Sequence, residues 1–518
     1  MKHLLALDAG TGSGRAVIFD EAGVQLAAAS REWHHTEDPR YPGSMDFAVE
    51  QNWQLMVTCI REAAAQVPNL DIAAISTTSM REGIVLLDRN GRELWACANV
   101  DSRAIAEVRE LRALRPGIEH AMYLRSGQTL ALGAAPRLRW LQRHRPDLYD
   151  RAEHMIMLSD WLAVRLGAAP AVDPSNGGTT GLLNLKTRTW DAEIVQAYEL
   201  DSRFTHTPVV ESGTVIGAVS HTCAAETGLK AGTPIVMGGG DAQLGAVGLG
   251  VVRPGQTAVL GGTFWQQMVN IDHAIEDPSG RTRINFHAMP GMWQAEAIVF
   301  FPGFAVRWFR DAMAPDIKAK AASEQRDAYA LLEEMASTAP PGANGILPIF
   351  SDAMNYSRWR HAAPSFLNLT VDPQTTSRAA LFRALQENAA IVTLANLQQI
   401  ASITGRFPDA VTFASGAAKG ALWSQILADV LQVEVTTPVV KEATSLGAVI
   451  CAGIGIGLYA SFAEAARQLV RMERSYAPNP ANAAVYADLL ERWRAAYALQ
   501  LELADRGVTK SMWRAPGE

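Results

Sequence analysis

Cysteines are few in this chain, and their positions suggest neither a metal site nor a disulfide framework. The four of them, Cys59, Cys97, Cys223 and Cys451, are scattered over 518 residues. No two form a CxxC pair, and no histidine stands near one at metal-ligand spacing. The pattern therefore excludes a zinc module or a disulfide-stabilised small domain, and it predicts a protein of the reducing cytoplasm.

Long apolar runs and a strong charge of one sign are also missing. The apolar run before Asp8 is too short for a signal peptide. The longest uncharged stretch, Thr444 to Phe462, carries glycines at 447, 453, 455 and 457, which predicts a buried helix and not a membrane span. The net charge of −7 offers no general attraction for nucleic acid or an anionic membrane. We expect neither as a partner, so any bound phosphate must be held by a local site.

What the chain does have is the composition and length of a globular protein with two domains. Apolar residues make up 48% and charged residues 19%, and 518 residues exceed what one core usually holds. Strand-like segments surround a glycine turn near the N-terminus and a second one at residues 256–271, whereas helical periodicity dominates later, as at 378–402. We predict two α/β domains, residues 1–246 and 247–518, that meet close to residue 247.

The first glycine turn lies in LDAGTGSGRAVIFD, residues 7–20, between two strand-like runs. A dinucleotide-binding loop needs a helix directly after its glycines, and nothing in the chain matches the GxxxxGK[ST] pattern of a Walker A loop. The remaining interpretation is a hairpin turn whose backbone amides and hydroxyls, from Thr11 and Ser13, hold a phosphate chain. Asp8 at the mouth of such a loop would repel phosphate unless a cation lay between them, so we expect it to organise Mg²⁺ through water. The alternative is a tight hairpin with an exposed aspartate.

A second turn of the same form, at Gly261, Gly262 and Thr263, favours a paired phosphate clamp. Just ahead of it, VMGGGDAQLG places Asp241 directly after three glycines. Glycines allow the backbone to approach a ligand closely, and a protruding carboxylate can orient a hydroxyl and take its proton as it attacks a γ-phosphate. We therefore predict Asp241 as a catalytic base; the alternative is a residue that caps the following helix.

Five segments, taken in order along the chain, resemble the FGGY carbohydrate kinases: LDAGTGSGRAVIFD, GGGDAQLG, LGGTFWQQ, GAAKGALWSQILADV and KEATSLGAVICAG. The resemblance runs essentially from end to end. It implies an α/β fold of two actin-like (ribonuclease-H-like) ATPase domains around a central cleft. It also implies ATP and Mg²⁺ as cofactors and a small hydroxylated molecule as the phosphate acceptor.

Six further segments, among them SMREGIVL at 79–86 and VDPSNGGTTGLL at 172–183, are most similar to one particular enzyme of that family. This similarity implies the terminal hydroxyl of linear 4,5-dihydroxy-2,3-pentanedione as the acceptor. Two alternatives stay open. One is the same chemistry on another polyol or ketose, such as glycerol, xylulose or ribulose, and the other is an actin- or chaperone-type ATPase that uses nucleotide as a switch. The family also suggests regulation by a phosphotransferase-system carrier protein.

The resemblance implies roles for individual residues. Asp241 matches the catalytic base and Asp8 the metal-associated acid. Contacts to ATP are expected on the two glycine loops and on a later adenosine turn, at Thr11, Gly12, Ser13, Arg15, Gly261, Gly262, Thr263, Gly416, Ala417 and Lys419.

The acceptor pocket is predicted around Arg81 and Glu82, which match a polyol-binding pair of the family. A guanidinium donates and a carboxylate accepts hydrogen bonds, so the two can read a chain of hydroxyl and carbonyl groups. Without the family context, a surface ion pair would be the default interpretation. Asp101, with Arg103, is a weaker candidate for the same pocket. We also expect Trp265 to roof a compact five-carbon ligand, with a place in the core as the alternative.

Some positions depart from the family pattern. Gly12 stands where glycerol kinases carry a second threonine, so Ser13 must supply more of the phosphate contact. Ser415 replaces the first glycine of the adenosine turn. Val100 and Leu132 replace a tryptophan and a substrate-facing tyrosine, which makes the predicted acceptor pocket less aromatic and less polar.

Overall fold

The strands predicted around the two glycine turns are present. The computed structural model describes residues 2–358, 360–439 and 442–514. The first turn lies among β1 (His3–Ala9), β2 (Ser13–Asp20) and β3 (Gln25–Glu32), and the second between β12 (Thr257–Gly261) and β13 (Trp265–Ile271). Each turn joins two antiparallel strands, β1 to β2 and β12 to β13, and is therefore a hairpin.

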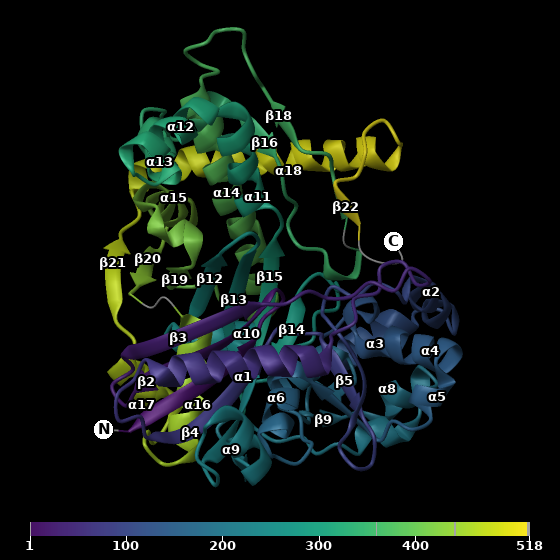
Figure 1. Cartoon of the computed structure of the whole chain (residues 1–518). Helices are drawn as coiled ribbons and strands as arrows, with labels where there is room; N and C mark the ends of the chain where they lie inside the picture. The colour runs from purple at the N-terminus through teal and green to yellow at the C-terminus, as the bar shows by residue number, and fades with distance from the viewer. Residues whose placement is uncertain (1, 359, 440–441, 515–518) are drawn as a thin grey trace.

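Strands from the first half of the chain build a six-stranded sheet in the order β10 (Val215–Ala218), β11 (Pro234–Gly240), β4 (Ile72–Ser79), β1, β2, β3. Helices cover both of its faces (Figure 1), with α1 (Val49–Ala65) and α6 (Leu158–Leu166) on one and α16 (Ala443–Gly455) on the other. The alternation of side chains along β1 accounts for this, since Leu5 and Leu7 pack beside α1 and α6 while Leu4 and Ala6 pack beside α16. Asp8 continues the α16-facing series of β1.

The second sheet has seven strands, in the order β14 (Arg283–Phe286), β15 (Trp293–Val299), β13, β12, β19 (Ala410–Ala414), β20 (Glu434–Pro438), β21 (Met472–Tyr476). α14 (Arg378–Thr404) and α15 (Ala421–Leu431) cover one face. α10 (Asp241–Gly248) packs on the other, where Ala242 and Ala246 meet Ala258 and Met268. The helix predicted at 378–402 is thus α14.

α10 and α16 pack against each other between the two sheets (Figure 1). Glycines make this close crossing possible, because a Cβ at Gly248 would overlap the Ala443 carbonyl oxygen and one at Gly447 the Leu244 carbonyl oxygen. The predicted buried helix is confirmed for the first part of the uncharged stretch, since α16 ends at Gly455 and residues 456–461 are non-helical. The predicted domain division between residues 246 and 247 falls inside α10 and stays a prediction.

A smaller lobe extends the first half of the chain. Its three-stranded sheet has the order β6 (Glu93–Cys97), β5 (Ile84–Leu87), β7 (His154–Met157). Four helices share its core: α2 (Ile105–Ala113), α3 (Ile118–Ser126), α4 (Ala134–His144) and α8 (Ala192–Ala197). In Figure 1 these helices form the blue lower right part of the molecule.

The remaining elements are mostly short. The helices are α5 (Pro146–Tyr149), α7 (Pro174–Gly177), α9 (His221–Thr227), α11 (Pro302–Trp308), α12 (Pro315–Glu324), α13 (Ala328–Ala336), α17 (Phe462–Leu469) and α18 (Ala483–Asp505). The strands are β8 (Leu183–Asn184), β9 (Thr189–Trp190), β16 (Leu347–Ile349), β17 (Arg360–His361), β18 (Ser365–Leu367) and β22 (Trp513–Arg514). Among the helices in the described part of the chain, none is both long and apolar enough to cross a lipid bilayer.

Candidate active site

Asp241 is the first residue of α10, directly after the end of β11. The glycines before it serve packing between chain segments, because a Cβ at Gly238 would overlap the Thr77 carbonyl oxygen of β4. The Asp241 side chain is 41% exposed, and its Oδ1 accepts a hydrogen bond from the Ala242 amide at 2.7 Å. The carboxylate is thus anchored through one oxygen and can still be reached by a ligand.

Asp8 and Asp241 both bind a proton more tightly than an ordinary aspartate. Burial, and then repulsion by Asp241, raises the pKa of Asp8 to about 7. Burial also raises the pKa of Asp241 to about 6, although the Arg81 guanidinium opposes the rise. Asp241 is therefore more basic than an ordinary aspartate while still ionised at neutral pH, which suits a general base.

Arg81 connects Asp241 to the second sheet. Its Nε lies 3.9 Å from Asp241 Oδ1, and its Nη1 and Nη2 donate to Glu296 Oε2 and Oε1 at 2.5 and 2.8 Å. Asn285 Nδ2 donates to Glu296 Oε2 at 2.6 Å. Burial is the largest single influence and would raise the pKa of Glu296, but the charge and hydrogen bonds of Arg81, the charge of Arg283 and the Asn285 hydrogen bond together lower it. The buried, bidentate geometry holds the guanidinium rigidly beside the predicted base.

Glu82 has a partner of its own on the second sheet. Arg283 Nη2 donates to Glu82 Oε1 at 2.6 Å, and Arg283 Nε donates to Gln128 Oε1 at 2.8 Å. The side chains of Arg81 and Glu82 are only 6% and 12% exposed, so the alternative of a surface ion pair is wrong. Arg81 and Glu82, predicted as one pair, instead form two separate ion pairs. Arg81 pairs with Glu296 on β15, and Glu82 pairs with Arg283 on β14.

Sequence reasoning missed Glu296 and Arg283. Glu296 had a signal, because it is a lone charged residue inside the strand-like segment WQAEAIV, whereas Arg283 only begins the strand RINF. Buried charges are rare unless they are paired, so such a residue predicts an opposite charge nearby. The identity of the partner could not be read from the sequence, since Arg81 and Glu296 are 215 positions apart.

Asp101 is not placed to contact an acceptor directly. Its side chain is 0% exposed, and its Oδ2 accepts from the Met45 amide at 2.7 Å and from Arg103 Nε at 2.8 Å. The Asp101 carbonyl oxygen accepts from Arg137 Nη2 at 3.2 Å. The predicted acceptor contact is thus corrected: this carboxylate supports the loop around it, because its hydrogen bonds go to neighbouring chain.

Trp265 also lies elsewhere than predicted. Its side chain is 0% exposed and belongs to the main core of the second half of the chain. Its ring centroid is 4.9 Å from those of Phe413 and Trp423. A fully buried ring cannot roof a ligand, so the alternative of a core tryptophan holds. The period of two along β13 gives the reason, since Trp265 points to the α14 side of the sheet while Gln266 and Met268 point to the α10 side.

The predicted first phosphate loop is an exposed tip held by side chains from the following segment. Trp33 Nε1 donates to the Gly10 carbonyl at 3.1 Å, and His35 Nε2 lies 2.6 Å from the Thr11 carbonyl oxygen. A Cβ at Gly12 would meet nothing within 4 Å. The tip is therefore open on its outer side, where a phosphate group would have to lie.

A cavity of about 600 Å³ lies between the strands that flank this loop and the predicted adenosine turn. Asp8, Arg15, Gly416, Lys419 and Glu442 are among the residues that line it. Arg15 Nη1 lies 3.1 Å from Glu442 Oε2, so an ion pair joins β2 to the start of α16 across the cavity. The structure thus brings Asp8 and Arg15 to one space with Gly416 and Lys419 of the predicted adenosine turn, whereas Thr11, Gly12 and Ser13 are not among the residues that line it.

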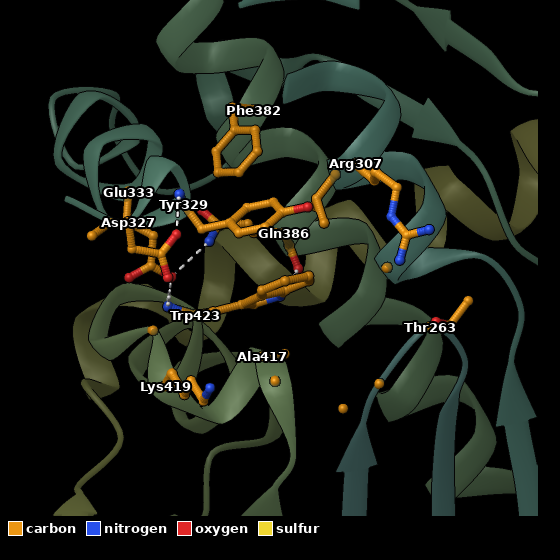
Figure 2. Close-up of a pocket in the computed structure, with 17 residues that line it drawn as sticks. Thr263, Arg307, Asp327, Tyr329, Glu333, Phe382, Gln386, Ala417, Lys419 and Trp423 are labelled. Carbon is orange, nitrogen blue, oxygen red and sulfur yellow. Dashed lines mark hydrogen bonds between the residues drawn. The ribbon is translucent and has the colours of Figure 1, made fainter. Parts of the chain in front are cut away.

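A second cavity, of about 520 Å³, lies beside the second glycine loop (Figure 2). It is lined by all six residues predicted for that loop and for the adenosine turn: Gly261, Gly262, Thr263, Gly416, Ala417 and Lys419. Figure 2 shows Thr263 and Arg307 on one side of the cavity and Asp327 and Glu333 on the opposite side. A Cβ at Gly261 would lie 2.9 Å from Ala417 Cβ, so the loop can approach the predicted adenosine turn only without a side chain there.

The far wall of this cavity was not predicted. Glu333 of α13 accepts hydrogen bonds from Gln386 Nε2 at 3.0 Å and from the Trp423 amide at 3.3 Å. Trp423 Nε1 donates to the Gln386 carbonyl at 3.0 Å (Figure 2). Burial raises the pKa of Glu333 despite these donors. Tyr329 completes the wall. These residues come from three helices and share no sequence motif, so only the packing of α13, α14 and α15 assembles them.

Ser415, which begins the adenosine turn, has a backbone conformation that favours glycine. Its φ is 76° and its ψ is −164°. Such angles cost a residue with a side chain about 1–3 kcal/mol and tend to occur at functional sites. The departure from glycine noted in the sequence therefore introduces strain at the edge of both cavities.

The surroundings of Asp8 fit a magnesium ion that is bound mostly by water and phosphate oxygens and by few protein groups. Asp8 Oδ1 is buried and has no hydrogen-bond partner among the described residues. Within the same residues, no three His, Cys, Asp or Glu side chains gather as a metal-binding group. Mg²⁺ commonly binds one or two carboxylates and keeps water and phosphate oxygens for its other positions. A single orphaned carboxylate facing a phosphate loop matches that preference.

The chain matches two family models. Residues 3–248 match the N-terminal domain of the FGGY family of carbohydrate kinases, and residues 267–456 match its C-terminal domain. The chain is 55% identical over 518 residues to autoinducer-2 kinase from Salmonella paratyphi B, with 99% of this chain and 98% of the relative covered. It is 54% identical over 520 residues to autoinducer-2 kinase from Klebsiella pneumoniae, with 100% and 98% covered.

Solved structures of sugar kinases share the fold. Xylulose kinase from Rhodospirillum rubrum has a TM-score of 0.86 at 26% identity, covering 97% of this chain and 99% of that one. Plasmodium falciparum glycerol kinase with ADP has a TM-score of 0.83 at 19% identity, covering 97% and 98%, and shows the fold alone. The predicted α/β fold with two actin-like domains is confirmed.

Proposed function

Because the chain belongs to the FGGY family of carbohydrate kinases, and so transfers phosphate to a hydroxyl group, we propose that its acceptor is autoinducer-2. The reacting group is the terminal hydroxyl of linear 4,5-dihydroxy-2,3-pentanedione, and ATP is the phosphate donor. The observation that carries the proposal is the 55% identity, over nearly the whole of both chains, to proteins named for this activity. Substrate choice rests on a few pocket residues, so enzymes that share a fold can act on different acceptors. High identity over the full length is therefore a better guide to the acceptor than the fold is.

In this proposal the residues around Asp241 prepare the acceptor. Asp241 accepts the proton of the terminal hydroxyl as that oxygen attacks the γ-phosphate. Arg81 donates to, and Glu82 accepts from, the oxygens of the five-carbon chain, and their ion pairs with Glu296 and Arg283 hold them in place. Fixing the acceptor in this way matters, because a displacement of about 1 Å can cost a factor of about 10² in rate.

The two glycine loops hold the phosphates of ATP. Thr11, Gly12, Ser13 and Arg15 are proposed to bind on one side and Gly261, Gly262 and Thr263 on the other, through amides and hydroxyls. Gly416, Ala417 and Lys419 are proposed to hold the adenosine beside the cavity of about 520 Å³. Closure of the two domains would exclude water, which competes with the acceptor for phosphate.

Asp8 is proposed to hold Mg²⁺ through water, and the ion, when bound, neutralises the charge that develops on the phosphate oxygens. The cytoplasm is the proposed location, since all four cysteines are buried free thiols, a state that a reducing compartment preserves. Regulation by a phosphotransferase-system carrier protein stays a prediction, which a pull-down with the purified carrier would test.

The experiment is a measurement of ADP release by the purified protein with Mg²⁺ and ATP. The acceptors compared are dihydroxypentanedione, glycerol, xylulose, ribulose and gluconate, each against a reaction without acceptor. We expect strong stimulation by dihydroxypentanedione alone. Stimulation by another compound would overturn the acceptor but keep the kinase, whereas ATP consumption that no acceptor changes would favour an ATPase switch.

A further inference from the structure

The segment VDPSNGGTTGLL folds into a polar turn, residues 173–180, inside the protein. Its polar side chains are each at most 2% exposed: Asp173, Ser175, Asn176, Thr179 and Thr180. Burying so many polar groups together destabilises a protein unless they are hydrogen-bonded. The partners of these side chains therefore indicate what the turn does.

One hydroxyl of the turn holds the backbone directly before Asp241. The Gly240 amide donates to Ser175 Oγ at 3.0 Å, and Ser175 Oγ donates in turn to Asp173 Oδ1. A Cβ at Gly239 would overlap Ser175 Oγ, so the turn and the end of β11 are in close contact. Ser175 thereby helps to determine where α10 begins and where its first carboxylate lies.

A second hydroxyl holds Glu82. The Glu82 amide donates to Thr179 Oγ1 at 3.2 Å. Glu82 has a φ of 62°, the left-handed region that residues with a side chain seldom adopt. Its carbonyl oxygen accepts from Arg137 Nη1 on the other side. Side chains thus stabilise this strained backbone at both its amide and its carbonyl, and the amide partner comes from the turn.

An amide side chain of the turn reaches the strand that leads to Arg81. Asn176 Nδ2 donates to Ser79 Oγ at 2.9 Å and to Ser159 Oγ at 3.0 Å. Ser79 is the last residue of β4, two positions before Arg81. The turn is therefore bonded to β4, to Glu82 and to the end of β11, which are the segments that carry the proposed acceptor-binding and catalytic residues.

We propose that the turn is a positioning element that sets the distance between Glu82 and Asp241 through the hydroxyls of Thr179 and Ser175. Neither hydroxyl is proposed to touch the acceptor. Thr179 acts through the amide of Glu82, which binds the acceptor, and Ser175 acts through the amide of Gly240, which directly precedes the base. The proposal rests on the proposed function insofar as Glu82 and Asp241 serve an acceptor. Its physical basis is that transfer depends on how the acceptor hydroxyl lies between a binding group and a base.

Thr179 and Thr180 provide a matched pair for the test. Both are buried, and each Oγ1 donates to the carbonyl oxygen three residues earlier, at 2.7 and 2.6 Å. Each also accepts one amide at 3.2 Å, but Thr179 accepts that of Glu82 whereas Thr180 accepts that of Leu182. Threonine to valine keeps the shape and removes the hydroxyl, so Thr179→Val and Thr180→Val differ mainly in the loss of the bond to Glu82.

The experiment compares Thr179→Val, Thr180→Val and the wild type for thermal stability, KM for ATP, and kcat and KM for whichever acceptor the wild type uses. We expect kcat/KM for the acceptor to fall about tenfold to a hundredfold in Thr179→Val alone, with KM for ATP unchanged. Equal kinetic losses in the two variants, or no loss in Thr179→Val, would overturn the proposal. The acceptor is identified first with the wild type. An incorrect autoinducer-2 assignment would be seen in that measurement and would not be confused with the effect of Thr179→Val.

A second variant keeps the proposal testable if Thr179→Val does not fold. Ser175→Ala removes the acceptor of the Gly240 amide, and we expect a lower kcat with KM for ATP unchanged. If Ser175 acts through the base, Ser175→Ala should lower the residual kcat of Asp241→Asn little or not at all. Additive losses in the double variant would mean that Ser175 does not act through Asp241, and would overturn its positioning role.

Discussion

The proposed acceptor end of the cleft is closed by paired charges, whereas the proposed nucleotide end is an open cavity walled by aromatic rings and glycines. Around Asp241, two arginines and two glutamates form ion pairs that cross from the first half of the chain to the second sheet. At the other end, the cavity of about 520 Å³ has loop backbone on one side and Tyr329 and Trp423 on the other. A small, oxygen-rich acceptor needs fixed donors and acceptors, while a large nucleotide can be held by shape and main-chain amides.

The largest effect is expected at the acceptor end, from Asp241→Asn. Loss of the general base should lower kcat by a factor on the order of 10²–10⁴. Binding of ATP, measured by calorimetry, should stay within about twofold, because the asparagine keeps the shape and the nucleotide end is unchanged. A comparable loss of nucleotide affinity would mean that the two ends are not separate and that Asp241 is not acting as a base.

Buried and exposed ion pairs between the two halves of the chain should differ strongly. Glu296→Gln leaves the buried Arg81 charge without its main partner, and we expect the free energy of unfolding to fall by about 3–5 kcal/mol. Glu442→Gln breaks the pair with Arg15, whose side chains are 44% and 31% exposed, and should cost less than about 1 kcal/mol. Urea unfolding of both variants measures the difference; equal losses would contradict the importance of burial.

At the nucleotide end, Glu333→Ala should weaken ATP binding specifically. The carboxylate accepts bonds from Gln386 Nε2 and from the Trp423 amide, so its removal frees the cavity wall to shift. We expect KM for ATP to rise about tenfold, the effect of roughly 1.4 kcal/mol, with KM for the acceptor unchanged. Glu334→Ala, the adjacent residue with a 60% exposed side chain, is the control and should change neither constant. A change in acceptor KM of the same size would contradict the separation of the two ends.

Acidification should lower the activity in two steps, because Asp8, whose pKa is raised to about 7, gains a proton before Asp241, whose pKa is raised to about 6. The protonated form of Asp241 cannot accept the hydroxyl proton, and its pKa is raised to about 6. The Asp241 step should therefore lower kcat/KM for the acceptor as the pH is lowered through about 6, by a factor that approaches tenfold per pH unit below it. Stopped assays between pH 5 and pH 8, with ATP binding measured in parallel, test this over roughly the range where the carboxylate titrates. A flat profile would argue against Asp241 as the base.

The smallest effect is expected from Ser415→Gly at the edge of the nucleotide cavity. Glycine adopts φ 76° without the strain that serine carries there. The variant should be more stable by about 1 kcal/mol, since part of the relief is offset by the greater entropy of glycine in the unfolded chain. Thermal unfolding measures the change. A loss of stability would mean that the Ser415 side chain makes contacts worth more than its backbone strain.

Sequence reasoning succeeded where a local pattern determines the local structure. The glycine turns and Asp241 are each defined by neighbouring residues, so their hairpins and the helix start could be predicted. It failed for Trp265, because the side of a strand on which a residue lies depends on register and not on the adjacent motif. It also failed for Asp101, because a carboxylate in a promising motif was already bonded to Met45 and Arg103.

By itself, the sequence determined the class of fold, the two hairpin loops and the identity of the family, since these follow from short-range patterns repeated in order along the chain. Only the tertiary structure decided which charged and polar groups are partners: Arg81 with Glu296, Glu82 with Arg283, and Thr179 with the Glu82 amide. The physical reason is separation along the chain. These groups lie between 97 and 215 positions apart, so only the packing of the two sheets and the buried turn brings them within bonding distance.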